Sequence, residues 1–162
     1  MKMIVCVSDN FGIGYKNDLL FSLPPDMKFF RETTLGKIVI MGRSTLDSFP
    51  GGKALKNRVN IVLTRDKDFC REDVLAFHSV EDVLSHIEKY NSDDVYVIGG
   101  AEIYGLFEPY CDTALVTRVR KNPLADKFFF NIDESANWEK ESESEMMEHD
   151  GCEFTFCRYI RK

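Results

Sequence analysis

The stretch VYVIGGAEIYGLFEPY, from Val95 to Tyr110, decides the fold class. Its first part is a short, continuous run of β-branched and aromatic residues, which predicts a strand buried on both faces, as in a parallel sheet. Gly99 and Gly100 end this run, and the helical segment AEIYGLFEPY follows until Pro109 stops it. A strand, a glycine turn and a helix in succession indicate a βαβ crossover.

The same pattern recurs along the chain. Further strands are predicted from the runs MIVCV (3–7), KIVIMG (37–42), VNIVLT (59–64) and TALVTRV (113–119). Between them PPDMKFFRETTL (24–35) begins with prolines and repeats apolar residues at helical spacing. SVEDVLSHIEKY (79–90) also reads as a helix, with Ser79 placed to cap it through the backbone of Asp82.

The C-terminal part has a different pattern. CEFTFCRYI alternates apolar and polar residues, WEKESESEM does so weakly, and MEHDG between them predicts the turn of an antiparallel hairpin at the sheet edge. We therefore expect one α/β domain over residues 1–162, with a mostly parallel central sheet, flanking helices and a C-terminal antiparallel hairpin. Ligands of such sheets bind at the carboxyl ends of the strands.

Composition narrows the function classes. The 162 residues are 44% hydrophobic and 12% aromatic, as in a soluble globular protein, and no apolar run is long enough to cross a bilayer. With no secretory signal, we expect a cytoplasmic protein without a membrane partner. The net charge of −6 argues against nucleic-acid binding. Five scattered cysteines and three histidines lack metal-ligand spacing, which indicates buried free thiols and no metal.

Charge is unevenly distributed. Residues 26–71 hold ten lysines and arginines against five acids, although the whole protein is acidic. Such a basic segment favours a confined anionic ligand over a long polyanion, and an ordinary solvated surface is the alternative.

Three strand ends carry residues suited to phosphate. VIMGRST (39–45) places a glycine before Arg43 and Thr45 at the start of a helical turn, where backbone N–H groups and a guanidinium can bind an anion. VLTR (62–65) offers Thr64 and Arg65 for a second phosphate, such as the 2′-phosphate that separates NADP from NAD. VIGGAEIY (97–104) removes two side chains where a ligand must come close. Alone, each motif also fits an ordinary turn.

The stretch FSLPPDMKFF (21–30) places one carboxylate, Asp26, among apolar neighbours with no basic partner on the same turn. An unpaired buried charge is costly, so such a group shifts its pKa or meets a ligand. Phe30 follows four residues later on the same helix face and can touch the same ligand.

Together these motifs resemble the dihydrofolate reductase family along essentially the whole chain. The matching segments are GIGYKNDLLFSLPPDMKFF, VIMGRST, VNIVLTR, VIGGAEIYGLF, LVTRV and the late Trp138 before the hairpin. The resemblance implies NADPH-dependent reduction of 7,8-dihydrofolate to 5,6,7,8-tetrahydrofolate, by hydride transfer from nicotinamide C4 to pterin C6 with protonation at N5 promoted by Asp26. A monomer is the corresponding expectation.

The resemblance also assigns site residues. Asp26, Phe21 and Thr117 form the catalytic group, in which Thr117 hydrogen-bonds the acid, and Arg58 pairs with the glutamate α-carboxylate of the substrate. The implied substrate contacts are Ile4, Val5, Asp26, Met27, Phe30, Phe49, Leu55, Arg58, Ile98 and Thr117. The implied NADPH contacts are Cys6, Ile13, Gly14, Leu19, Gly42, Arg43, Ser44, Thr45, Leu63, Thr64, Arg65, Gly99, Gly100, Ala101, Glu102, Ile103 and Tyr104.

Backbone features follow from the same resemblance. The segment from Asp9 to Leu23 corresponds to a mobile loop that closes over the nicotinamide, with Gly12 and Gly14 consistent with hinge freedom. The Gly99-Gly100 bond is typically cis in this family.

Two differences from the family pattern bear on the site, and the sequence leaves two alternative functions open. Phe21 stands where the family often has tryptophan, which removes an N–H that could hold water, and LKNR (55–58) replaces a proline-glycine turn before Arg58. One alternative is the riboflavin-pathway pyrimidine reductase of the same fold, which lacks an acid equivalent to Asp26. The other is a non-catalytic nucleotide-binding module.

Overall fold

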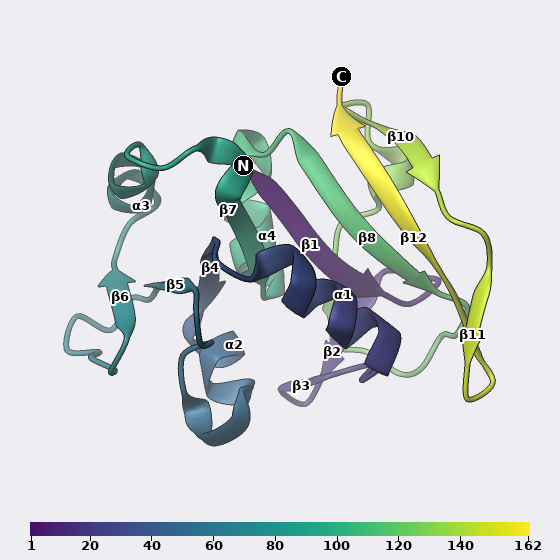
Figure 1. Cartoon of the computed structure of the whole chain (residues 1–162), viewed down its shortest axis with the longest axis horizontal. Helices are drawn as coiled ribbons and strands as arrows, with labels where there is room; N and C mark the ends of the chain where they lie inside the picture. Colours follow the sequence, from purple (N-terminus) through teal and green to yellow (C-terminus); the bar gives the residue numbers. More distant parts are fainter.

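The computed structural model describes residues 1–162 and is built on a nine-stranded sheet (Figure 1). The strand order is β10-β12-β8-β1-β7-β4-β5-β6, with β11 paired to β12. The parallel strands are β1 (Lys2–Val7), β4 (Ile38–Gly42), β5 (Val59–Leu63), β6 (Val74–Phe77), β7 (Val95–Gly99) and β8 (Thr113–Val119). Every predicted parallel strand is present, and β6, which is too short and half-exposed to be recognised by its pattern, is additional.

Helices cover both faces of the sheet, with α1 in front and α4 behind it in Figure 1. The four α-helices are α1 (Pro24–Thr34), α2 (Arg43–Ser48), α3 (Val80–Ile87) and α4 (Ala101–Phe107). The 3-10 turns are η1 (Pro50–Gly52), η2 (Ser92–Asp94), η3 (Glu108–Tyr110) and η4 (Ile132–Glu134). The Ser79 side chain accepts a hydrogen bond from the Asp82 backbone N–H, so the predicted cap of α3 is confirmed.

Alternate residues of the strands enter two separate cores, which explains the continuous apolar runs. In β1, Met3 and Val5 join the core under α3 and α4, whereas Ile4 joins the smaller core under α1 and α2. Leu46, fully buried on α2, packs in that smaller core. The same packing therefore fixes both the sheet and the helices that follow its strand ends.

The predicted antiparallel hairpin is present at the sheet edge. It consists of β10 (Trp138–Glu143), β11 (Met147–His149) and β12 (Cys152–Arg161), and β12 also pairs with β8. The prediction that all of MEHDG is a turn was wrong, because Met147–His149 forms β11. Only Asp150 and Gly151 turn, both with positive φ, which a tight reversal requires.

The segment expected to be a mobile loop forms part of a second, three-stranded sheet. Its strands are β2 (Gly12–Tyr15), β3 (Asp18–Leu19) and β9 (Lys127–Phe128). The Asp126 side chain stabilises this second sheet, because its Oδ2 accepts a hydrogen bond from the Lys16 backbone N–H at 3.1 Å. Gly12 serves close packing here, because a Cβ would stand 2.8 Å from Ala125 Cβ.

The thiols are all free. Cys111, Cys152 and Cys157 are buried as expected, whereas Cys6 is half-buried and Cys70 is exposed in the loop after β5. No group of three or more His, Cys, Asp or Glu side chains is arranged to hold a metal ion. None of the helices combines the length and apolar character needed to span a membrane.

Candidate active site

A cavity of about 1310 Å³ opens at the carboxyl ends of β1, β4, β5 and β7. Helix α1 forms one wall and the starts of α2 and α4 form another. Every site residue predicted from the sequence lines this cavity except Thr117, which lies behind it. The parallel sheet thus brings together side chains that are far apart in the chain.

Asp26 lies in the first turn of α1, with its carboxylate at the cavity wall. Burial raises the pKa of Asp26, and hydrogen bonds from Thr117 and the Cys6 thiol oppose that rise. The Thr117 hydroxyl donates to Asp26 Oδ1 at 2.6 Å, from the buried middle of β8. The acid is therefore oriented by protein on one side and left open to a ligand on the other.

Apolar side chains line the same cavity as the acid. Ile4 and Ile98 are buried, and Phe30, Phe49 and Leu55 are half-buried, so each presents part of its surface to the cavity. Met27, predicted as a substrate contact, is not packed in the core, because 56% of its surface is exposed. It lines the cavity next to Asp26, and an apolar ligand would cover it.

Arg58, predicted to pair with a carboxylate of the substrate, lines the cavity beside Leu55. Its Nε donates to Thr34 Oγ1 at 2.9 Å, and its two terminal nitrogens donate to the Lys56 carbonyl at 3.0 Å and to the Arg31 carbonyl at 3.4 Å. None of these hydrogen-bond partners is a carboxylate. Burial lowers the pKa of Arg58, and the nearby charge of Arg31 adds to this effect. Arg31 also lines the cavity. Two guanidinium groups thus favour an anion at this end.

The cations predicted to bind phosphate are paired with acids. Arg43 contacts Asp66 at 2.9 Å and Asp47 at 3.6 Å, while Arg65 contacts Glu102 at 2.9 Å. The Arg65 side chain is 91% exposed, so its pairing costs little to exchange for a phosphate.

The glycine pair shapes the gap between β7 and α4. Gly99-Gly100 is a cis peptide bond, as expected, and Gly99 has φ of 122°, where a Cβ would stand 3.3 Å from the Tyr104 ring. A Cβ on Gly100 would stand 3.7 Å from Thr45 Oγ1 and fill the space between the starts of α2 and α4. Neither helix start is capped by a side chain. The residues present therefore fit a ligand with phosphates.

Several lining residues were not predicted as site residues. They are Tyr15, Asn17, Asp18, Leu20, Ser22, Arg31, Ser48, Pro50, Asp66, His78, Ser79, Val80, Leu106 and Lys127. Some had a signal, since residues 15–18 lie within the loop segment and Arg31 adjoins Phe30. His78 had none. Its Nδ1 lies 2.9 Å from the Thr64 carbonyl oxygen, and because a carbonyl only accepts, Nδ1 carries the hydrogen and donates it. The other ring nitrogen, Nε2, makes no hydrogen bond within the chain.

A parallel α/β sheet, two uncapped helix starts suited to phosphates and an apolar pocket with one oriented acid fit a nucleotide-dependent oxidoreductase. A family model described as dihydrofolate reductase matches residues 1–161. The chain belongs to the dihydrofolate reductase family.

Individual relatives agree. Dihydrofolate reductase of Neisseria gonorrhoeae is 34% identical over 162 residues, covering 100% of this chain and 98% of that protein. The Bacillus subtilis enzyme is 36% identical over 138 residues, covering 85% and 79%. A structure of Enterococcus faecalis dihydrofolate reductase complexed with NADP(H) and RAB-propyl superposes with a TM-score of 0.88 at 33% identity, covering 99% of this chain and 95% of that one. These matches do not favour the pyrimidine reductase alternative.

Proposed function

We propose that this protein reduces 7,8-dihydrofolate to 5,6,7,8-tetrahydrofolate with NADPH, and that Asp26, Thr117 and Phe21 form its catalytic group. The observation that carries the proposal is the partly buried Asp26 carboxylate, which pairs with no basic side chain and is held by Thr117 at 2.6 Å in the wall of the cavity. A flat heterocycle with amidine-type N–H groups satisfies such a carboxylate, because both oxygens can accept hydrogen bonds.

Asp26 binds the pterin and promotes its protonation. The carboxylate accepts hydrogen bonds from the 2-amino group and the adjacent ring nitrogen, so N5 lies out of its direct reach and the proton travels through water. Burial raises the pKa of Asp26, which brings proton exchange closer to neutral pH. Phe21 lines the cavity and excludes bulk water, but it has no N–H to order a relay molecule.

NADPH supplies the hydride, from nicotinamide C4 to pterin C6. Its adenosine and phosphates are held by Arg43, Ser44 and Thr45 at the start of α2 and by Thr64 and Arg65 after β5. The remaining proposed contacts are Cys6, Ile13, Gly14, Leu19, Gly42, Leu63, Gly99, Gly100, Ala101, Glu102, Ile103 and Tyr104, all of which line the cavity. A 2′-phosphate replaces Glu102 as the partner of Arg65.

The substrate tail extends toward Arg58. Ile4, Val5, Met27, Phe30, Phe49, Leu55 and Ile98 enclose the pterin and the aminobenzoyl ring. Arg58 pairs with the glutamate α-carboxylate, since its guanidinium meets no acid through the hydrogen bonds it makes in the chain. The long-range attraction of Arg31 supports the same anion.

We propose further that the chain acts as one domain and as a monomer in the cytoplasm, without nucleic acid. The continuous sheet supports one domain, because β8 and β12 join the C-terminal hairpin to the strands that carry the site. The net charge of −6 disfavours a polyanionic partner.

The test follows NADPH oxidation by nicotinamide absorbance, with dihydrofolate present or absent. We expect oxidation that requires dihydrofolate and is far slower with NADH. A folded protein that binds NADPH but does not oxidise it with dihydrofolate would overturn the proposal.

A further inference from the structure

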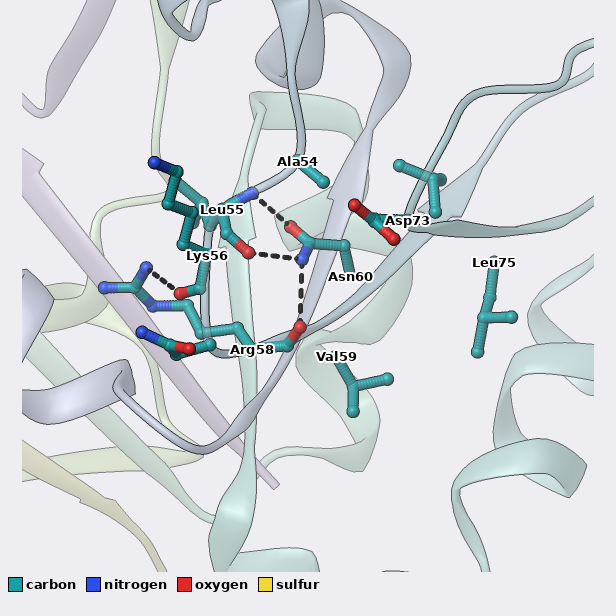
Figure 2. A pocket seen from close by; sticks show the side chains of 10 residues that line it. Ala54, Leu55, Lys56, Arg58, Val59, Asn60, Asp73 and Leu75 are labelled. Atoms are coloured by element: carbon teal, nitrogen blue, oxygen red, sulfur yellow. Dashed lines mark hydrogen bonds between the residues drawn. The ribbon is translucent and has the colours of Figure 1, made fainter.

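The Asn60 side chain holds the loop that carries Leu55 and Arg58, as Figure 2 shows. Asn60 lies on β5 and is only 2% exposed. Its Oδ1 accepts from the Leu55 N–H at 2.9 Å, and its Nδ2 donates to the Leu55 carbonyl at 2.9 Å and to the Arg58 carbonyl at 3.2 Å. One amide group thus satisfies three backbone groups of a segment that belongs to no helix or strand.

Elsewhere in the loop, the Asn57 carbonyl accepts a hydrogen bond from the Gly36 backbone N–H at 2.8 Å. The Leu55 backbone forms no hydrogen bond to another backbone group, so the Asn60 amide takes the place of a missing strand partner. A hollow of about 730 Å³ lies beside the loop, lined by residues 54–60 and 73–75 (Figure 2). Because packing is incomplete on that side, the place of the loop depends on directional bonds.

Arg58 is held both through its backbone carbonyl and through its guanidinium, whose terminal nitrogens donate to the Lys56 and Arg31 carbonyls. Its carbonyl is bound by Asn60, while its Nε donates to Thr34 Oγ1 at 2.9 Å. Thr34 is fully buried in α1 and its hydroxyl donates to the Phe30 carbonyl at 2.8 Å, which fixes its orientation. The guanidinium therefore meets the cavity in a preset position, so less freedom is lost on binding an anion.

We infer that Asn60 is a positioning residue for substrate binding. It does not line the cavity, and it acts through Leu55 and Arg58, which do. This inference rests on the proposed function, because it assumes that the aminobenzoyl-glutamate tail of dihydrofolate binds these two residues. Asn60 then sets affinity for the tail without affecting the pterin or NADPH.

Asn60→Asp is the sharpest variant, since it keeps the shape and the acceptor but removes both donors. A carboxylate would face two backbone carbonyls and displace the loop. We expect KM for dihydrofolate to rise by about tenfold, with kcat within about twofold and KM for NADPH unchanged. Thr155→Val removes a hydroxyl of similar burial on β12 and controls for general destabilisation.

Two further measurements separate positioning from a general structural role. The binding of 6-methyl-7,8-dihydropterin, which lacks the tail, should be unchanged in Asn60→Asp. In an Arg58→Leu background, Asn60→Asp should weaken dihydrofolate binding much less than it does in the native chain, because the group it positions is gone. Equal losses for both ligands, or fully additive effects of the two substitutions, would overturn the inference.

Equilibrium binding by quenching of protein fluorescence keeps this test apart from the proposed function. If the native chain binds dihydrofolate through Arg58 but does not turn it over, the reductase proposal fails. The binding affinities of the two single variants and the double variant then still decide the role of Asn60. If the native chain binds dihydrofolate and Arg58→Leu does not weaken that binding, the positioning inference fails even though turnover is intact.

Discussion

Thr117 and Asp26 are 91 residues apart in sequence, yet the threonine hydroxyl donates to the carboxylate at 2.6 Å. Thr117 belongs to β8 and Asp26 to α1, so this bond joins the sheet to the helix that walls the cavity. Burial raises the pKa of Asp26 and the hydrogen bonds from Thr117 and Cys6 restrain it. The bond therefore sets both where the acid points and how readily it ionises.

Replacing Thr117 by valine should move the pH dependence of kcat/KM to higher pH. The hydroxyl stabilises the charged carboxylate, and its loss lets burial raise the pKa of Asp26 further. Activity that needs a proton then persists to more alkaline conditions, although its maximum falls because the acid is less well oriented. Initial rates at low dihydrofolate across the pH range measure this. Thr113→Val, on the same strand, is the control, and an unshifted profile in Thr117→Val would contradict the prediction.

Asp26→Asn should reduce kcat by about 10²- to 10⁴-fold near neutral pH while leaving NADPH affinity intact. It should also make the folded state more stable. The folded pKa of Asp26 lies above the unfolded value of 3.8, so the protonated form contributes stability at low pH and this is lost as pH rises through the folded pKa. The asparagine side chain does not ionise, so the variant does not lose this stability as pH rises.

Urea unfolding of the two proteins without ligands checks that sign. Their stabilities should be similar below the unfolded pKa of Asp26, and Asp26→Asn should be the more stable at neutral pH. Glu72→Gln, at an exposed position, controls for loss of one negative charge. A variant that is less stable than the native chain at neutral pH would show that Asp26 contributes more through its bond to Thr117 than it costs by burial.

Arg65→Gln should raise KM for NADPH by about tenfold or more and leave that for NADH unchanged, because only NADPH carries the 2′-phosphate. Arg65 is highly exposed and pairs only with Glu102, so folding should be unaffected. Steady-state kinetics with each cofactor gives the ratio of KM for NADPH to KM for NADH. Arg120→Gln removes a charge elsewhere on the surface and should leave the ratio intact. Equal losses with the two cofactors would place Arg65 away from the 2′-phosphate.

Local patterns predicted the main elements well because each carried its own signal. The apolar strand runs and the Ser79 cap need no information from distant residues. In contrast, β2 pairs with β9 across more than a hundred residues, and neither strand is long enough to show a period. The resemblance to the family, rather than periodicity, predicted the Asp26–Thr117 contact.

The site shows the same limit. The family pattern names Arg58, but it does not reveal that Thr34 and Asn60 hold it, because side-chain bonds to a loop leave no repeat in the sequence. Nor could the sequence show that Arg65 pairs with Glu102, since Arg65 follows β5 and Glu102 lies in the first turn of α4, and only the fold brings them together.

His86 on α3 should make the protein less stable as pH falls from about 7 to about 5. Its Nε2 is buried without a hydrogen-bond partner, and its ring lies 5.0 Å from that of Phe77. Burial lowers the pKa of His86 below the ordinary 6.5, and the charge of Lys89 adds to this. The unfolded chain therefore binds the proton more tightly, so stability is full above the unfolded pKa and declines below it.

His86→Leu should flatten this decline, because leucine binds no proton and fits between Phe77 and Tyr90. Lys89→Gln should flatten it only in part, since burial of the ring is the larger cause and remains. Urea midpoints of the three proteins at several pH values between about 5 and 8 provide the comparison. The native chain and His86→Leu should differ in slope below pH 7 and run parallel above it. Parallel curves throughout would mean that the ring takes up its proton as easily in the folded chain as in the unfolded one.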